Sequence, residues 1–152
     1  TFKGVRRRFE THVRTDKFVY IDDYAHHPRE LDATISAAKE LYPDRKLTVV
    51  FQPHLFSRTK DLCDEFAVSL SKADELFLLD IYPAREKPME GVTSQIILDK
   101  VTIANKSIVA KEELVDILKA DNSLQVVLTV GAGDIDTKVS AIKNLLLLKN
   151  DE

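Results

Sequence analysis

Three of the four histidines in this chain lie in two short polar segments. His26 and His27 follow two aspartates, a tyrosine and an alanine, and His54 is soon followed by a serine and an arginine. Imidazole has a reference pKa of about 6.5, so these side chains can exchange protons with a substrate near neutral pH. Both segments are therefore candidates for a functional site.

Each segment also has a structural interpretation. A histidine before Pro28 can serve only as a helix cap, and Asp22-Asp23 can form a solvated turn. A metal site is disfavoured, because adjacent side chains on an extended segment point in opposite directions and His26 and His27 would make poor joint ligands. We therefore expect no bound metal, and leave the first two alternatives open.

Two further segments are suited to anions. Arg6-Arg7-Arg8 can contact a phosphate or form a solvated charge run. Gly131-Ala132-Gly133 follows an apolar run and precedes a helical pattern, so its backbone N–H groups could hold a phosphate. It lacks the third glycine of a dinucleotide-binding fingerprint, and no Walker A pattern occurs in the sequence. A tight strand-to-helix turn explains the glycines equally well.

The bulk composition limits the class of protein. The 152 residues suffice for one domain with a core, and 44% hydrophobic and 31% charged residues are ordinary for a soluble protein. The net charge of -3 and the lack of an apolar run near ~20 residues predict neither a nucleic-acid nor a membrane partner. The presence of a single cysteine, Cys63, excludes an internal disulfide and fits a reducing cytoplasm. Cys63 is expected in the core or at its boundary rather than as a nucleophile.

The sequence alternates strand and helix patterns. Residues 9–15 and 17–21 predict an antiparallel hairpin with a turn at Thr15-Asp16. Runs that are apolar on both faces predict buried parallel strands. These runs are 47–51, 76–79 and 125–130, with a weaker one at 107–110.

Apolar residues at helical spacing lie between these runs. One helix is expected after Pro28, and another carrying Leu62, Phe66 and Leu70 after Ser57 as its N-cap. Three more are marked by Ile97 and Val101, by Leu114 and Leu118, and by Ile135, Val139, Ile142 and Leu146. We predict a doubly wound, mostly parallel, Rossmann-like α/β sheet with an antiparallel edge hairpin. The polar segments then lie at the carboxyl ends of strands, where such sheets bind ligands.

Five motifs in order along the chain resemble the C-terminal domain of the Mur ligases. They are Gly4-Val-Arg-Arg-Arg-Phe-Glu10, Asp22-Asp-Tyr-Ala-His-His-Pro28, Phe51-Gln-Pro-His-Leu-Phe-Ser-Arg-Thr59, Asp80-Ile-Tyr-Pro-Ala-Arg-Glu86 and Gly131-Ala-Gly-Asp134. The resemblance implies that residues 1–152 form a single domain, the third of a three-domain ligase. The UDP-sugar domain and the central ATPase domain would lie outside this chain, which opens without a methionine.

The resemblance also implies a reaction in the bacterial cytoplasm. ATP would activate the carboxylate of UDP-N-acetylmuramate as an acyl phosphate, and the amine of L-alanine would attack it. ATP and Mg²⁺ would be bound mainly by the central domain, so this domain alone is expected to be inactive.

Residue roles follow from the same motifs. Arg8 matches an arginine that reaches the nucleotide phosphates, and Asp23 matches an acidic residue that helps hold the nucleotide. The positions around L-alanine are Tyr24, His26, His54 and Arg58. Within this set, the resemblance implies that Arg58 binds the carboxylate and that His26 or His54 orients the amine or takes up its proton. Some members carry a second arginine where this sequence has Leu55, so carboxylate binding would depend more on Arg58.

Two other functions compete with this one. A related ligase attaches a whole tripeptide to the same sugar nucleotide and shares the Asp-Asp-aromatic-Ala-His-His-Pro segment. The segment from Gln52 to Thr59 favours the alanine reaction. A stand-alone module that binds a nucleotide or peptide without catalysis is the alternative of a different class.

Overall fold

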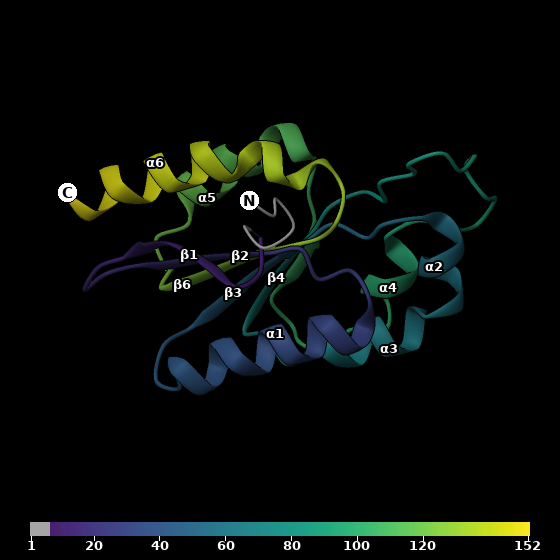
Figure 1. Ribbon diagram of the computed structural model, residues 1–152, viewed down its shortest axis with the longest axis horizontal. Coiled ribbons are helices and arrows are strands. Elements are labelled where there is room, and N and C mark those ends of the chain that lie inside the picture. Colours follow the sequence, from purple (N-terminus) through teal and green to yellow (C-terminus); the bar gives the residue numbers. More distant parts are fainter. Residues whose placement is uncertain (1–6) are drawn as a thin grey trace.

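The computed structural model describes residues 7–152 and places them in one six-stranded sheet between two layers of helices (Figure 1). The strands are β1 (Glu10–Arg14), β2 (Val19–Asp23), β3 (Leu47–Phe51), β4 (Glu75–Leu78), β5 (Lys106–Ile108) and β6 (Val126–Val130). Their order is β1-β2-β6-β3-β4-β5, with β1 antiparallel to β2 and every other neighbour parallel. The predicted fold class is confirmed.

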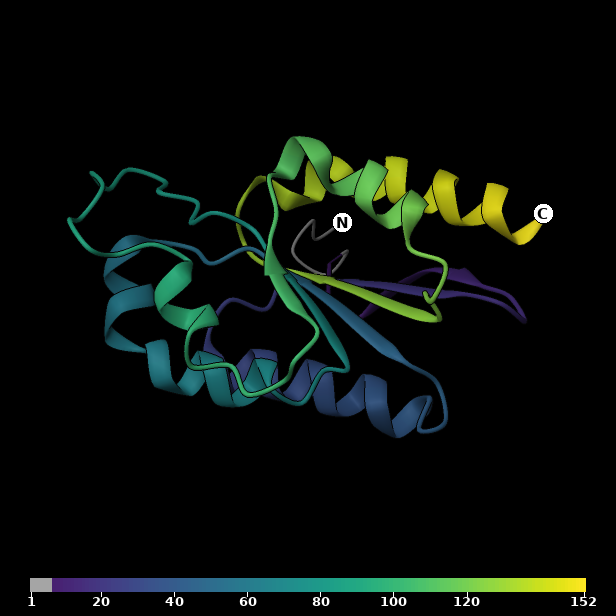
Figure 2. The same ribbon diagram turned by 180° about the vertical axis from the view of Figure 1, so that it is seen from behind.

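The helices divide between the two faces of the sheet (Figure 2). One face is covered by α1 (Pro28–Leu41), α3 (Cys63–Leu70) and α4 (Gln95–Leu98), the other by α5 (Leu114–Ala120) and α6 (Val139–Asn150). Short helical turns precede three of these helices. They are α2 (Phe56–Asp61), η2 (Lys111–Glu113) and η3 (Asp134–Lys138).

The central strands are buried on both sides, which explains their apolar sequences. Val49 packs into the cluster under α1 and α3, whereas its neighbour Val50 packs into the cluster under α5 and α6. Leu128 and Val127 of β6 divide in the same way. Strand alternation thus fixes both layers and leaves the polar loops at the ends of the strands.

The helical segment after β3 differs from the prediction. The chain breaks at Leu62 (φ -115°, ψ 20°), so two short helices, α2 and α3, replace one longer helix. The N-cap of α2 is Leu55, not Ser57 as predicted. The physical reason lies in the contacts of Ser57 described below. Pro28 does occupy the first turn of α1, after the N-cap His27.

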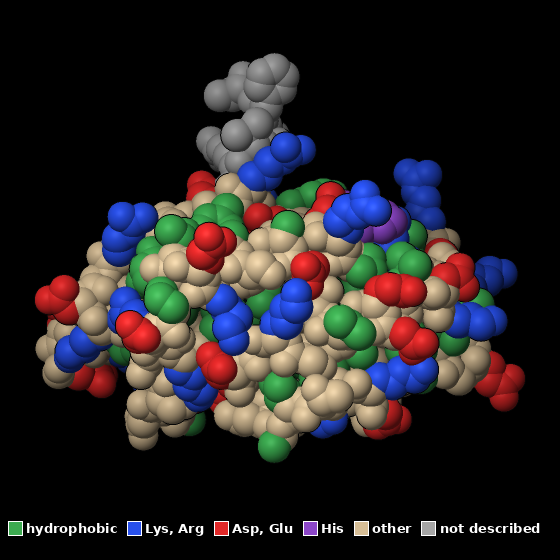
Figure 3. Space-filling view, turned by 90° about the horizontal axis from the view of Figure 1, so that it is seen from below, with side chains coloured by type: hydrophobic (Ala, Val, Ile, Leu, Met, Phe, Trp, Pro, Cys, Tyr) green, Lys and Arg blue, Asp and Glu red, His purple; other side chains and the backbone are tan. Residues whose placement is uncertain are grey.

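The described surface mixes charges of both signs. In the view of Figure 3, Lys and Arg side chains alternate with Asp and Glu side chains, and no broad area of that face has one sign. Among residues 7–152, no helix combines the length and the apolar character needed to cross a bilayer.

Candidate active site

Loops from neighbouring strands meet at one edge of the sheet, because β2, β6, β3 and β4 are parallel and end side by side. The loops after β3 and β4 pair through their backbones. The N–H of Tyr82 donates to the carbonyl of Pro53 at 2.8 Å, and the N–H of Leu55 donates to the carbonyl of Tyr82 at 2.9 Å. This pairing stacks the Tyr82 ring on that of His54, with centroids 5.8 Å apart and ring planes 15° apart.

The structure brings together the four residues expected around the amino acid. The His26 ring lies 6.0 Å from that of His54 and 5.2 Å from that of Tyr24, both edge to face. Arg58, in the first turn of α2, places Nη1 3.0 Å from His54 Nδ1. Tyr24 is 46% exposed, so a ligand can reach this cluster from solvent.

The contacts of His54 fix its protonation state. A guanidinium only donates hydrogen bonds, so Nδ1 of His54 must accept the bond from Arg58. Burial lowers the pKa of His54, and the charge of Arg58 and the nearby His26 lower it further. His54 is therefore neutral at pH 7 and carries its proton on Nε2.

The start of α2 is held from outside the helix. Leu55 has φ 74°, a conformation that costs a side-chain-bearing residue about 1–3 kcal/mol and is typical of functional sites. Glu86, from the loop after β4, accepts hydrogen bonds from the Ser57 backbone N–H at 3.1 Å and from its hydroxyl. These bonds lower the pKa of Glu86. Ser57 is thus the second residue of α2 rather than its N-cap, and Glu86 takes the place of a cap by accepting its backbone N–H and fixes the turn that presents Arg58.

A second cluster ties β1 to the same edge. Arg7 Nε lies 2.7 Å from one Asp22 oxygen and Nη2 lies 3.1 Å from the other, a two-pronged ion pair. Its Nη1 donates to the carbonyl of Gly131 at 2.7 Å. Asp22 also accepts the Thr129 hydroxyl, which is 2.8 Å from the buried Tyr20 hydroxyl. This network joins β1, β2 and β6.

The two residues expected to hold nucleotide adjoin this network. Asp23 accepts the backbone N–H of Phe9 at 2.7 Å and that of Ala25 at 2.8 Å. Burial raises the pKa of Asp23, although these bonds act in the opposite direction. Arg8 is exposed at the turn where Phe9 has φ 47°. Arg6, the first arginine of the basic run, lies outside the described residues.

The glycine segment after β6 packs against the loops after β3 and β4. A Cβ on Gly133 would lie 2.6 Å from Cγ of Tyr82 and would also overlap Gln52 Oε1. With the Gly131 carbonyl bound to Arg7, this geometry favours the tight turn over a phosphate cradle.

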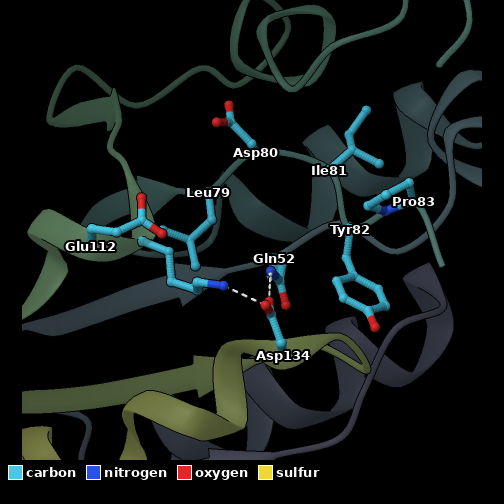
Figure 4. Close-up of a pocket in the computed structure, with 9 residues that line it drawn as sticks. Gln52, Leu79, Asp80, Ile81, Tyr82, Pro83, Glu112 and Asp134 are labelled. Atoms are coloured by element: carbon cyan, nitrogen blue, oxygen red, sulfur yellow. Dashed lines mark hydrogen bonds and ion pairs between the residues drawn. The ribbon is translucent and has the colours of Figure 1, made fainter.

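Beside this turn is a pocket of about 190 Å³, shown in Figure 4. Asp134 lies at its base, where one oxygen accepts from Gln52 Nε2 at 2.7 Å and the other pairs with Lys111 (Figure 4). Gln52 Oε1 accepts the backbone N–H of Ile135 at 2.9 Å. Burial raises the pKa of Asp134, but the bonds from Lys111 and Gln52 outweigh it and leave the pKa lowered. Gln52 thus connects the end of β3 to the start of η3.

Gly133→Ala is expected to lower the free energy of unfolding by about 2 kcal/mol, because the added methyl group overlaps Tyr82. Urea denaturation of the 152-residue chain measures this. In the comparison variant Gly91→Ala the new Cβ meets no atom within 4 Å, and only its φ of 78° is unfavourable. An unchanged midpoint for Gly133→Ala would show that the turn is not closely packed.

Sequence reasoning missed several residues of this edge. In the sequence, Arg7 is only one residue of a charge run, and Glu86, Gln52 and Asp134 belong to motifs that assign them no role. Lys111 carried no signal at all, since its partner lies 23 positions away in sequence. Pairs of residues that are distant in the sequence, such as Lys111 and Asp134, can be recognised only when the strand order is known.

The fold is that of a Rossmann-like α/β domain, with the histidine–arginine cluster at the carboxyl ends of its parallel strands. The family model for the Mur ligase, glutamate ligase domain matches residues 7–133, and the chain belongs to this family. It is 58% identical to the UDP-N-acetylmuramate–L-alanine ligase of Flavobacterium johnsoniae over 96% of its own length. It spans 32% of that relative.

Solved structures agree with the fold. The UDP-N-acetylmuramate–alanine ligase of Thermotoga maritima superposes with a TM-score of 0.75 at 27% identity, over 94% of this chain and 30% of that one. A domain from a Haemophilus ducreyi protein named as a UDP-N-acetylmuramate:L-alanyl-γ-D-glutamyl-diaminopimelate ligase has a TM-score of 0.67 at 21% identity. That match covers 91% of this chain and 99% of the Haemophilus domain, so a unit of this extent has been crystallised alone.

Proposed function

We propose that this chain is the C-terminal domain of an ATP-dependent ligase that joins L-alanine to UDP-N-acetylmuramate in bacterial peptidoglycan synthesis. The observation that supports it most is the cluster of Arg58, His54, His26 and Tyr24 at the carboxyl edge of the sheet. It places the fixed positive charge of Arg58 beside two imidazole rings whose centroids are 6.0 Å apart. The 58% identity to a relative named for this reaction supports the same substrate.

In this proposal the cluster binds the amino acid. Arg58 receives the carboxylate, for which a guanidinium offers two parallel hydrogen bonds. The imidazoles of His26 and His54 flank the amine, which attacks the acyl phosphate of the muramyl group. Arg8, exposed beside Arg7, contacts the nucleotide phosphates. Asp23 contributes to nucleotide binding chiefly by holding the turn at Phe9, because its two carboxylate oxygens accept the backbone N–H groups of Phe9 and Ala25.

The acyl-phosphate chemistry is assigned to parts of the protein that this chain does not cover. Among residues 7–152, no group of three or more His, Cys, Asp or Glu side chains is placed to hold a metal ion. We assign Mg²⁺ and most ATP contacts to a central domain. We therefore expect the isolated chain to be inactive. We place the reaction of the full-length protein in the cytoplasm.

Phosphate release by the full-length protein tests the proposal. The protein is given UDP-N-acetylmuramate, ATP and Mg²⁺, and either L-alanine or the tripeptide is added. Release that requires L-alanine is the expected result. Release only with the tripeptide would identify the related ligase that attaches a whole tripeptide, and release with neither would favour a non-catalytic binding module.

A further inference from the structure

The two histidines of the cluster are held in opposite tautomers. His54 accepts from Arg58 at Nδ1 and so carries its proton on Nε2. His26 has the reverse arrangement, because its Nδ1 lies 3.1 Å from the carbonyl oxygen of Tyr24, which can only accept. The proton of His26 is therefore on Nδ1, and its Nε2 has a lone pair. One ring offers a donor and its neighbour, 6.0 Å away, an acceptor.

Glu30 reinforces the tautomer of His26. One carboxylate oxygen accepts the backbone N–H groups of His26 and His27 at 3.2 and 3.1 Å, which closes a capping box at the start of α1. The same oxygen lies 3.6 Å from His26 Nδ1. A negative charge on this side favours a proton on Nδ1 over one on Nε2. The other groups around His26 are Tyr24, His27 and His54.

His54 has a different environment. Arg58 contributes a fixed positive charge at Nδ1, Glu86 a weaker negative influence, and Tyr82 stacks on the ring. A proton on Nδ1 would break the bond to Arg58 and place two positive charges side by side. His54 is thus poorly suited to take up a proton, and its Nε2–H can act only as a donor.

We propose that His26 is the residue that accepts the amine proton, that Glu30 is its positioning residue, and that His54 is a neutral hydrogen-bond donor. This assignment depends on the proposed amino-acid ligation for its substrate. The α-ammonium group gives one proton to His26 Nε2, and the freed lone pair forms the C–N bond. The C–O bond to phosphate breaks, and phosphate leaves with that electron pair and takes the second amine proton.

Long-range ¹H–¹⁵N correlation spectra of the 152-residue chain test the tautomers without any substrate. The chain has four histidines, so few signals have to be assigned. The buried residues of both apolar clusters all lie between residues 13 and 146, so the 152-residue chain contains its own core. Above pH 7.5, we expect Nε2 of His54 and Nδ1 of His26 to give the signals of protonated nitrogens. His26 found with its proton on Nε2, or His54 with its proton on Nδ1, would overturn the assignment.

Glu30→Gln tests the positioning role, because the amide oxygen can still cap α1 while the charge is lost. We expect the preference of His26 for the Nδ1–H tautomer to fall roughly two- to five-fold, as for a partly exposed charge pair. The matched control is Glu40→Gln, at an exposed position of the same helix, which should leave the tautomer unchanged. Equal effects of the two variants would remove Glu30 from the proposal.

In the full-length ligase, the two histidines should respond differently to glutamine, which keeps a donor but has no basic nitrogen. His54→Gln is expected to retain at least about tenfold more activity than His26→Gln. The reverse order would overturn the assignment of the proton acceptor. If the tautomers are as expected but the enzyme requires the tripeptide, the proposed substrate is wrong and the division of roles stands.

Discussion

Arg7→Ala is expected to lower the free energy of unfolding of the 152-residue chain by about 3 kcal/mol. The reason is the partner that the variant leaves behind. The Asp22 side chain is 2% exposed, so it would remain buried after losing its counter-charge and two of its hydrogen bonds. The Gly131 carbonyl would lose its donor as well. Urea denaturation followed by circular dichroism measures the change.

Arg14→Ala is the matched control, since Arg14 is an exposed arginine at the far end of β1, the strand that follows Arg7 in the chain. It should change the free energy of unfolding by less than about 0.5 kcal/mol. Combining Arg7→Ala with Asp22→Asn should recover part of the loss, because the uncompensated charge is removed. Equal losses for Arg7→Ala and Arg14→Ala would show that the ion pair contributes nothing to stability.

Arg58→Ala in the full-length protein is expected to raise the KM for L-alanine by about 30- to 150-fold, equivalent to roughly 2–3 kcal/mol of lost charge-assisted hydrogen bonding. With Leu55 in place of a second arginine, no neighbouring guanidinium at that position can substitute for Arg58. The KM values for ATP and UDP-N-acetylmuramate should change little. Phosphate release measures the three constants when L-alanine, ATP and UDP-N-acetylmuramate are each varied in turn with the other two held fixed.

Lys60→Ala serves as the control for Arg58→Ala, because Lys60 is an exposed cation on the same helix. Its KM for L-alanine should equal that of the unsubstituted protein. An Arg58→Ala enzyme with an unchanged requirement for L-alanine would place the carboxylate elsewhere and refute the assigned role.

The sequence predicted the sheet well because strand and helix periodicity depend on neighbours in the chain. The apolar run that became β3 is buried at all five positions, and the polar loops lie at the predicted edge. Periodicity failed at Leu62, where spacing alone indicates a continuous helix. The break there accompanies the external capping of α2 by Glu86, 29 residues from Ser57.

The contacts that organise the site could not be predicted in the same way. Arg7 and Gly131 are 124 residues apart, and they meet only because β6 inserts beside β2 in the sheet. The tautomers of His26 and His54 likewise depend on their hydrogen-bond partners: the Tyr24 carbonyl oxygen for His26 and the Arg58 guanidinium for His54. Such information resides in three-dimensional geometry rather than in residue type or spacing.

The reversed direction of β1 has a consequence for what the site contains. Glu10 pairs with Asp22 and Arg14 with Val19, so β1 begins where β2 ends. A parallel first strand of five residues would have begun about 17 Å away, at the opposite edge of the sheet. Parallel strands bring to their carboxyl edge only the residues that follow them. One antiparallel strand adds the residues that precede it, and this is how Arg7 and Arg8, which lie outside any strand-to-helix loop, come to the end of the sheet where Asp22 and Asp23 lie.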